Sequence, residues 1–92
     1  MKIQLKSSGD LRDYFGRVPQ EIEMAPGSSF GDLLGVIGER WGSKLPAYLW
    51  DAQENRFRGA VFLVLNKHVV QDLQTPLEDG SEVIVMRALS GG

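Results

Sequence analysis

The stretch that decides the fold is LEDGSEVIVMRALSGG, residues 77–92. Residues 81–89 alternate between two sets of side chains, which is typical of a strand with one buried face. That strand leads directly into a Gly-Gly pair, and a segment without Cβ atoms is thin and mobile and adds nothing to a core. We therefore expect a folded domain over residues 1–88 and a flexible tail over residues 89–92. The two alternating sets are Val83, Val85 and Arg87 on one face, and Ile84, Met86 and Ala88 on the other.

The composition favours a single small domain that binds neither nucleic acid nor membrane. Ninety-two residues suit one hydrophobic core, and a net charge of −2 argues against a basic patch that follows phosphates. No apolar run reaches the length of a membrane span. Because the first residues already alternate like a strand, we expect no signal peptide and a cytoplasmic protein. The chain has no cysteine and one histidine, so it offers no thiol nucleophile and no multi-histidine metal site.

Upstream of the deciding stretch, the pattern predicts strands over residues 1–6 and 19–25 that form a hairpin. A helix is predicted over residues 29–41, with Ser29 as its N-cap and Gly42 as a left-handed residue at its end. The apolar run at residues 59–66 is predicted to be a central strand that is buried on both faces.

A turn at Asn66-Lys67 and a short returning strand over residues 68–70 complete the prediction. The expected fold class is therefore α+β: a mixed sheet of four to five strands with one main helix packed on one face.

A single helix covers only one face of such a sheet, so the other face is left open. On that face we expect Val69, Ile84 and Met86. Apolar side chains gathered on an open sheet face indicate a surface that docks a partner, and here that surface lies beside the tail. The alternative is that these are scattered surface apolar residues, which are common.

The remaining distinctive side chains have ordinary structural interpretations. Trp41, Tyr48 and Trp50 are expected to cover one end of the core. His68 is expected on an exposed strand. Arg87 either is solvated at the end of its strand or pairs with an acidic residue of a partner.

Three segments together resemble the MoaD/ThiS group of ubiquitin-like β-grasp sulfur carriers. They are the terminal Ser-Gly-Gly, the entry Leu77-Glu78-Asp79-Gly80-Ser81-Glu82-Val83 and the strand end Val64-Leu65-Asn66-Lys67. The sequence departs from the family pattern where Lys67 replaces the usual turn glycine and where Ser90 replaces a frequent alanine. Residues 43–59 are longer than in compact bacterial members, which is similar to the archaeal-type MoaD-related branch and to the ubiquitin-related modifiers.

The resemblance implies a chemistry for the tail. An adenylating enzyme of the ubiquitin-activating type would use ATP and Mg²⁺ to activate the Gly92 carboxylate, and a persulfide donor would convert Gly92 to a thiocarboxylate. Leu89, Ser90 and Gly91 would thread into the larger subunit of molybdopterin synthase. The chain itself would bind no cofactor or metal, and it would be no enzyme alone but the small sulfur-donating subunit.

Two other functions stay open. A ubiquitin-like modifier shares the activation step but ends in an isopeptide bond between Gly92 and a lysine of another protein. A plain β-grasp interaction module would have a dispensable Gly92 and would depend on Ile84 or Met86 instead.

Overall fold

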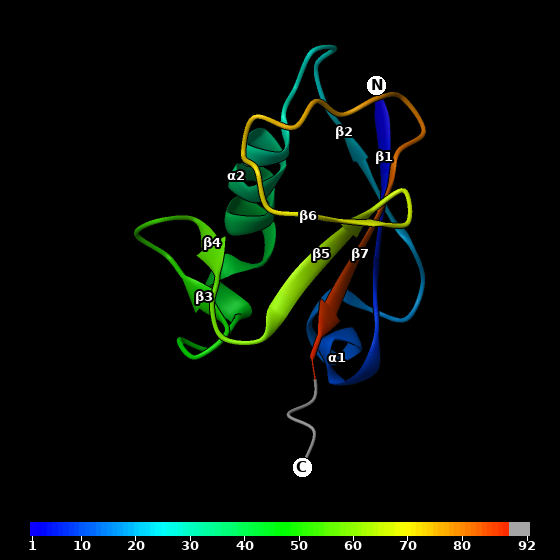
Figure 1. Ribbon diagram of the computed structural model, residues 1–92. Coiled ribbons are helices and arrows are strands. Elements are labelled where there is room, and N and C mark those ends of the chain that lie inside the picture. Colours follow the sequence, from blue (N-terminus) through cyan, green and yellow to red (C-terminus); the bar gives the residue numbers. More distant parts are fainter. Residues whose placement is uncertain (89–92) are drawn as a thin grey trace.

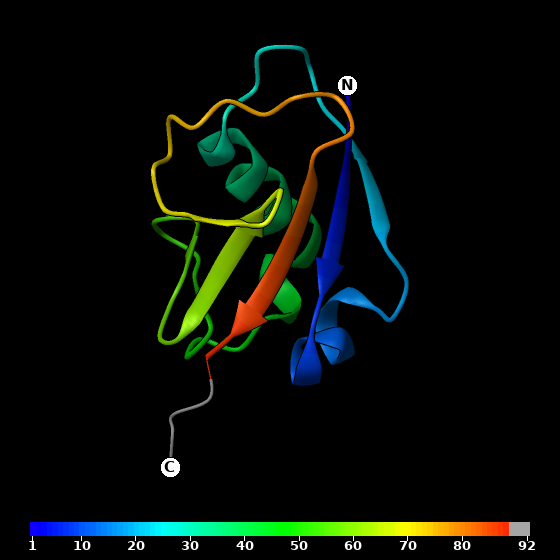
Figure 2. The same ribbon diagram turned by 45° about the vertical axis from the view of Figure 1, so that its right-hand side comes forward.

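The computed structural model describes residues 1–88 of the chain, which form a five-stranded mixed sheet with one main helix across one face (Figures 1 and 2). The strand order is β2-β1-β7-β5-β6. This arrangement confirms the predicted layers and the exposed second face of the sheet. The elements are β1 (Lys2–Ser7), β2 (Gln20–Glu23), α2 (Phe30–Trp41), β5 (Val61–Leu65), β6 (His68–Val70) and β7 (Glu82–Arg87).

The central strand of the sheet is β7. It runs parallel to β1 on one side and antiparallel to β5 on the other. The prediction that residues 59–66 form the central strand, buried on both faces, is therefore wrong. β5 lies next to the edge strand β6, and Leu63 is its one buried residue. No layer covers the face that carries Phe62 and Val64, and Val61 and Leu65 are only partly buried on the core side.

The helix α2 begins as predicted. Ser29 accepts a hydrogen bond from the backbone N–H of Asp32, and the Asp32 carboxylate accepts one from the backbone N–H of Ser29 at 2.8 Å. This reciprocal capping box satisfies N–H groups that a helix start leaves free. The prediction for Gly42 is wrong: its φ is −53°, so the chain stays right-handed and continues into a 3₁₀ turn, η2 (Gly42–Lys44).

The core lies between α2 and the sheet. One face of the helix points into it because its apolar residues recur at helical spacing. The strands contribute alternate residues, so Ile3 and Leu5 of β1 and Val83 and Val85 of β7 are buried. The central members of this core are Ile3, Leu5, Ile22, Leu33, Leu34, Ile37, Leu63, Val83 and Val85.

The segment between α2 and β5 forms a small hairpin that the sequence did not predict. Its strands are β3 (Trp50–Asp51) and β4 (Arg56–Phe57). The Trp50 and Phe57 rings meet with centroids 4.8 Å apart, and Trp50 is buried. Trp41 is buried as expected, but Tyr48 is 61% exposed, so the prediction that it covers the core is wrong.

The connection from β1 to β2 contains a 3₁₀ turn, η1 (Gly9–Leu11), and a short helix, α1 (Arg12–Phe15). Leu11 and Phe15 are buried. Both elements lie at the end of the molecule where β7 finishes (Figure 1). None of the helices in residues 1–88 combines the length and the hydropathy of a bilayer crossing.

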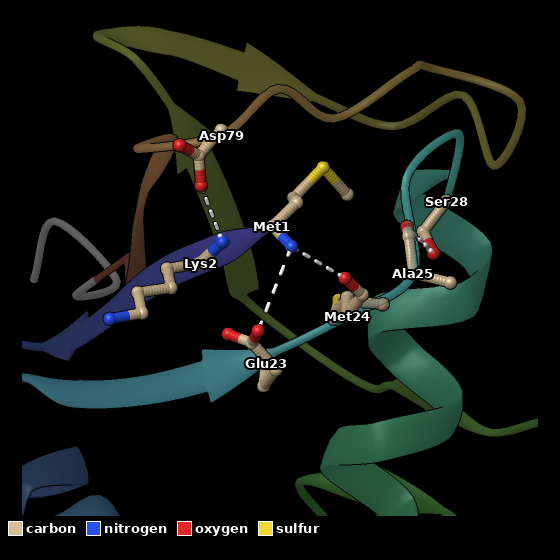
Figure 3. A network of polar contacts seen from close by, with 7 residues as sticks. All are labelled: Met1, Lys2, Glu23, Met24, Ala25, Ser28 and Asp79. Carbon is tan, nitrogen blue, oxygen red and sulfur yellow. Dashed lines mark hydrogen bonds and ion pairs between the residues drawn. The ribbon is translucent and has the colours of Figure 1, made fainter.

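The opposite end of the sheet is fixed by polar contacts (Figure 3). The Met1 ammonium donates to the Met24 carbonyl at 2.9 Å and lies 3.9 Å from a carboxylate oxygen of Glu23. The backbone N–H of Lys2 donates to Asp79 at 2.7 Å. These bonds tie the start of β1 to the end of β2 and to the turn before β7, so that β7 enters the sheet at a defined register.

Candidate functional site

The site begins with β7, because this strand joins the core to the predicted tail. Val83 and Val85 are fully buried between the sheet and α2. The strand ends at Arg87, at the opposite end of the molecule from the N-terminus (Figures 1 and 2). The predicted tail, Leu89, Ser90, Gly91 and Gly92, lies outside the described residues, so its roles stay predictions.

The open face of the sheet carries the three residues that the sequence placed there. Val64 on β5 lies opposite Ile84 on one side and opposite Val69 on the other. Met86, two positions beyond Ile84 on the same face, lies opposite Phe62. We call these five residues the open-face patch. Neighbouring strands are separated by about 5 Å, so these side chains form one continuous apolar surface.

Phe62 and Val64 were missed as members of this surface. The sequence analysis predicted that their strand is buried on both faces. Under that prediction, core-facing and open-face positions along the strand cannot be told apart. The antiparallel pairing turns Val61, Leu63 and Leu65 toward the core and leaves Phe62 and Val64 on the open side. Alternation along residues 61–65 would have identified them only if the second face had been known to be uncovered.

The rest of the open face is polar. β1 lies beside β7 with Lys6 opposite Ile84, and the Lys6 ammonium donates to Glu82 at 2.9 Å. Gln4 and Glu21 continue this polar area toward the edge strand β2. The open-face patch is therefore bounded on one side by charged and amide groups, which is the usual arrangement of an interface centre and its rim.

The end of β7 is held by Arg87. Its Nη1 lies 2.6 Å from Oδ2 of Asp10 in η1, and its Cζ lies 5.7 Å from the centre of the Tyr48 ring. The sequence analysis did not predict this pairing within the chain; a contact of Arg87 with an acidic residue of a partner stays a prediction. We call these three residues the Arg87 cluster.

Tyr14 lies beside this cluster on α1. A hydrogen bond with Tyr48 raises the pKa of Tyr14 above its ordinary value, and lost hydration and the charges of Asp10 and Asp13 act in the same direction. Tyr14 therefore stays protonated and neutral at physiological pH. The end of β7 is thus surrounded by two tyrosine rings and one ion pair.

The structure offers little for bound metal. Among residues 1–88, no three histidine or acidic side chains gather as a metal site requires. His68 is exposed on β6, as predicted. The chemically distinctive parts of the described chain are the open-face patch and the end of β7.

The fold is the ubiquitin-like β-grasp, and the chain belongs to the ThiS family, whose model matches residues 8–92. SAMP1, a small archaeal modifier protein from Haloferax volcanii, has a similar structure, with a TM-score of 0.79, 16% identity and complete coverage of both chains. A comparison with curated proteins finds no match to the sequence.

Two further solved structures are similar. A Pyrococcus furiosus protein assigned as molybdopterin converting factor subunit 1 is 24% identical with a TM-score of 0.73, over 97% of this chain and 99% of that one. A complex of subunits 1 and 2 of the molybdopterin-converting factor from Helicobacter pylori 26695 contains a chain that is 20% identical, with a TM-score of 0.66 and complete coverage of both chains. At these identities the likeness concerns the fold.

Proposed function

We propose that this chain is a sulfur carrier whose Gly92 is adenylated and converted to a thiocarboxylate, which then donates its sulfur in molybdopterin biosynthesis. One observation carries the proposal: the central strand β7 bears Ile84 and Met86 of the open-face patch and leads directly into residues 89–92. A partner that covers the patch therefore lies next to the start of that segment. The ThiS family match, which includes residue 92, supports the same assignment.

The proposed activation follows from the chemistry of a carboxylate. Its charge repels nucleophiles and oxide is a poor leaving group, so an adenylating enzyme must supply ATP and Mg²⁺. An oxygen of the Gly92 carboxylate attacks the α-phosphate of ATP, pyrophosphate leaves and an acyl-adenylate forms. We propose that this ATP-dependent cycle takes place in the cytoplasm.

The sulfur arrives in two steps. The terminal sulfur of a persulfide attacks the acyl carbon of Gly92 and displaces AMP, giving an acyl disulfide. A second thiol then attacks the donor's own sulfur, forms a disulfide with it and leaves the terminal sulfur on Gly92 as a thiocarboxylate. The chain has no cysteine, so under this proposal the sulfur travels on the carboxyl group alone.

The proposed receiver is the larger subunit of molybdopterin synthase. Leu89, Ser90 and Gly91 would lie in its channel, where glycines fit because they carry no side chain. The open-face patch would be covered by the same subunit. The Helicobacter pylori complex of subunits 1 and 2 supports this kind of assembly.

The test is sulfur transfer with a truncated chain. The adenylating enzyme, the persulfide donor and the larger subunit of the same organism are combined with ATP, Mg²⁺ and the pterin precursor. To this mixture we add either the native chain or a chain lacking Gly92. We expect the native chain to yield molybdopterin and the truncated chain to yield none, while both show the same thermal unfolding. Equal product from the two chains would refute the proposal.

A ubiquitin-like modifier is the second candidate, because the fold matches SAMP1 over the full length of both chains. It shares the acyl-adenylate but ends in an isopeptide bond to a lysine. Peptide mass spectrometry of the native lysate separates the two functions. Trypsin cuts after Arg87, so lysines that carry the remnant Ala88-Leu89-Ser90-Gly91-Gly92 of this chain would favour the modifier. Their absence alongside molybdopterin formation would favour the carrier.

A further inference from the structure

The strand β7 extends beyond its neighbour β1. Pairing between the two strands stops at Ser7 and Val85, and the backbone N–H of Ser8 makes the last bond, to the Val85 carbonyl at 3.1 Å. On its other side β7 pairs with β5 as far as Arg87, and the Ala88 N–H donates to the Ala60 carbonyl at 2.8 Å. The end of β7 therefore has backbone support on one side only.

The Arg87 cluster supplies contact on the unsupported side. Arg87 lies on the core-facing side of β7, and its guanidinium reaches Asp10 of η1, which is 77 positions away in the sequence. The same guanidinium lies over the ring of Tyr48, in the segment between η2 and β3. One side chain thus joins the end of β7 to two segments that the sheet does not connect to it.

These contacts are too exposed to contribute much to global stability. The side chains of Arg87 and Asp10 are 34% and 56% exposed, and solvent screens ion pairs of this kind. Their effect is instead local, because they oppose the opening of the last residues of a strand that is paired on one side. Contacts that fix geometry without adding much stability are typical of pre-organisation.

We propose that Arg87 is a positioning residue that fixes the end of β7, at Arg87 and Ala88, so that the adenylating enzyme meets this strand end in one orientation. The inference rests on the proposed function. Without Arg87 or Asp10 the end of β7 adopts more orientations, and the enzyme must select one of them when it binds. We therefore expect KM to rise, whereas kcat is unchanged because the reacting atoms at Gly92 are the same.

The first arm of the test is amide hydrogen exchange. It compares the native chain with Arg87→Gln, Asp10→Asn, the charge-reversed double variant Asp10→Arg with Arg87→Asp, and the control Arg56→Gln on β4. We expect exchange at Ala88 to be about threefold faster in the two single variants, with Val83 and Val85 unchanged. The double variant should recover protection. Unchanged exchange at Ala88 in both single variants would overturn the proposal.

The second arm is ATP–pyrophosphate exchange with the adenylating enzyme of the same organism. We expect KM to rise about threefold in Arg87→Gln and in Asp10→Asn, at unchanged kcat, and to recover in the double variant. A rise in Arg87→Gln alone, with Asp10→Asn silent, would mean that Arg87 meets the enzyme directly and would overturn the proposal. No exchange with the native chain would refute the proposed function, while Ala88 exchange would still decide whether the cluster fixes the strand end.

Discussion

Gly35 and Gly38 lie on one helix, yet their surroundings differ. A Cβ at residue 38 would lie 2.6 Å from Oδ1 of Asn55 and 3.1 Å from Cζ2 of Trp50, whereas a Cβ at residue 35 would meet no atom within 4 Å. Gly38 therefore permits the close approach of the β3–β4 hairpin. Both glycines weaken the helix relative to alanine. The packing role of Gly38 could not be predicted, because the hairpin that packs on it was not predicted.

The two glycines form a matched pair of variants. We expect Gly38→Ala to lower the free energy of unfolding by about 1–3 kcal/mol, because Trp50 or Asn55 must move. Gly35→Ala should raise it by about 1 kcal/mol, because alanine favours the helix and the space is open. Urea unfolding of both variants measures the difference. Equal effects would show that the hairpin does not pack on Gly38 as described.

The surroundings of Asp51 predict that the free energy of unfolding depends on pH. The backbone N–H of Glu54 bonds to its carboxylate at 3.1 Å, and Arg58 lies 3.2 Å from the second oxygen; together they hold the pKa of Asp51 below its ordinary value. A lowered folded-state pKa stabilises the fold above the unfolded pKa of about 4, and this stabilisation is lost as pH falls through the folded value. The native chain should therefore exceed Asp51→Asn in stability at pH 7 and lose that advantage progressively as the pH falls below the unfolded pKa of about 4, in chemical unfolding at a series of pH values. A constant difference at every pH would contradict this account.

Individual residues could be predicted where the signal is local. Ser29 was predicted as the N-cap of α2 and is confirmed there, whereas the reciprocal bond that the Asp32 carboxylate accepts from the Ser29 N–H was not predicted. Asn66 and Lys67 both adopt positive φ in their turn, as the predicted tight turn requires. The Arg87–Asp10 pair could not be predicted, because only the parallel pairing of β1 with β7 brings together two residues so distant in the sequence.

At the scale of elements, α2 depends on its first turn. Ser29→Ala removes the side-chain acceptor of the Asp32 N–H, and we expect it to cost about 1 kcal/mol of folding free energy. Ser43→Ala, on the exposed η2, is the matched control and should be close to neutral. Thermal or urea unfolding measures both. A loss of equal size in the two variants would show that the cap contributes nothing specific.

The open-face patch makes a separate prediction for β7. Ile84→Lys puts a charge at its centre, and burying that charge against a partner should weaken binding of the larger molybdopterin synthase subunit by about tenfold or more. Glu21→Lys, on β2 of the same face, is the control and should bind within about twofold of the native chain. Isothermal titration, with thermal unfolding alongside, measures both. Undiminished binding by a folded Ile84→Lys chain would exclude the patch from the interface.

The order of elements could be predicted from the sequence, but the order of strands in the sheet could not. Periodicity shows that residues 61–65 form a strand and that residues 82–87 alternate, yet it carries no information on which strands are neighbours. The most apolar run therefore seemed central, whereas the strand that alternates occupies the centre. The hairpin β3–β4 was missed because two-residue strands leave no periodic pattern.

On the scale of the whole molecule, the sheet has two ends and two faces, and each of them has a different role. Polar bonds at Met1, Lys2 and Asp79 fix one end, and β7 finishes at the other, beside the Arg87 cluster (Figures 1 and 3). α2 covers one face of the sheet and leaves the open-face patch on the second. The proposed carrier function uses this geometry, since one strand connects the docking surface to the segment that ends in Gly92.

The most direct measurement of the central claim is the intact mass of the untagged protein purified from its own cells, with labelled-thiol alkylation of the terminus. We predict that part of the protein carries sulfur in place of one carboxylate oxygen at Gly92, that this fraction is alkylated there, and that it grows when ATP, the adenylating enzyme and a persulfide donor are added. A mass that stays unmodified under all of these conditions would contradict the sulfur-carrier account.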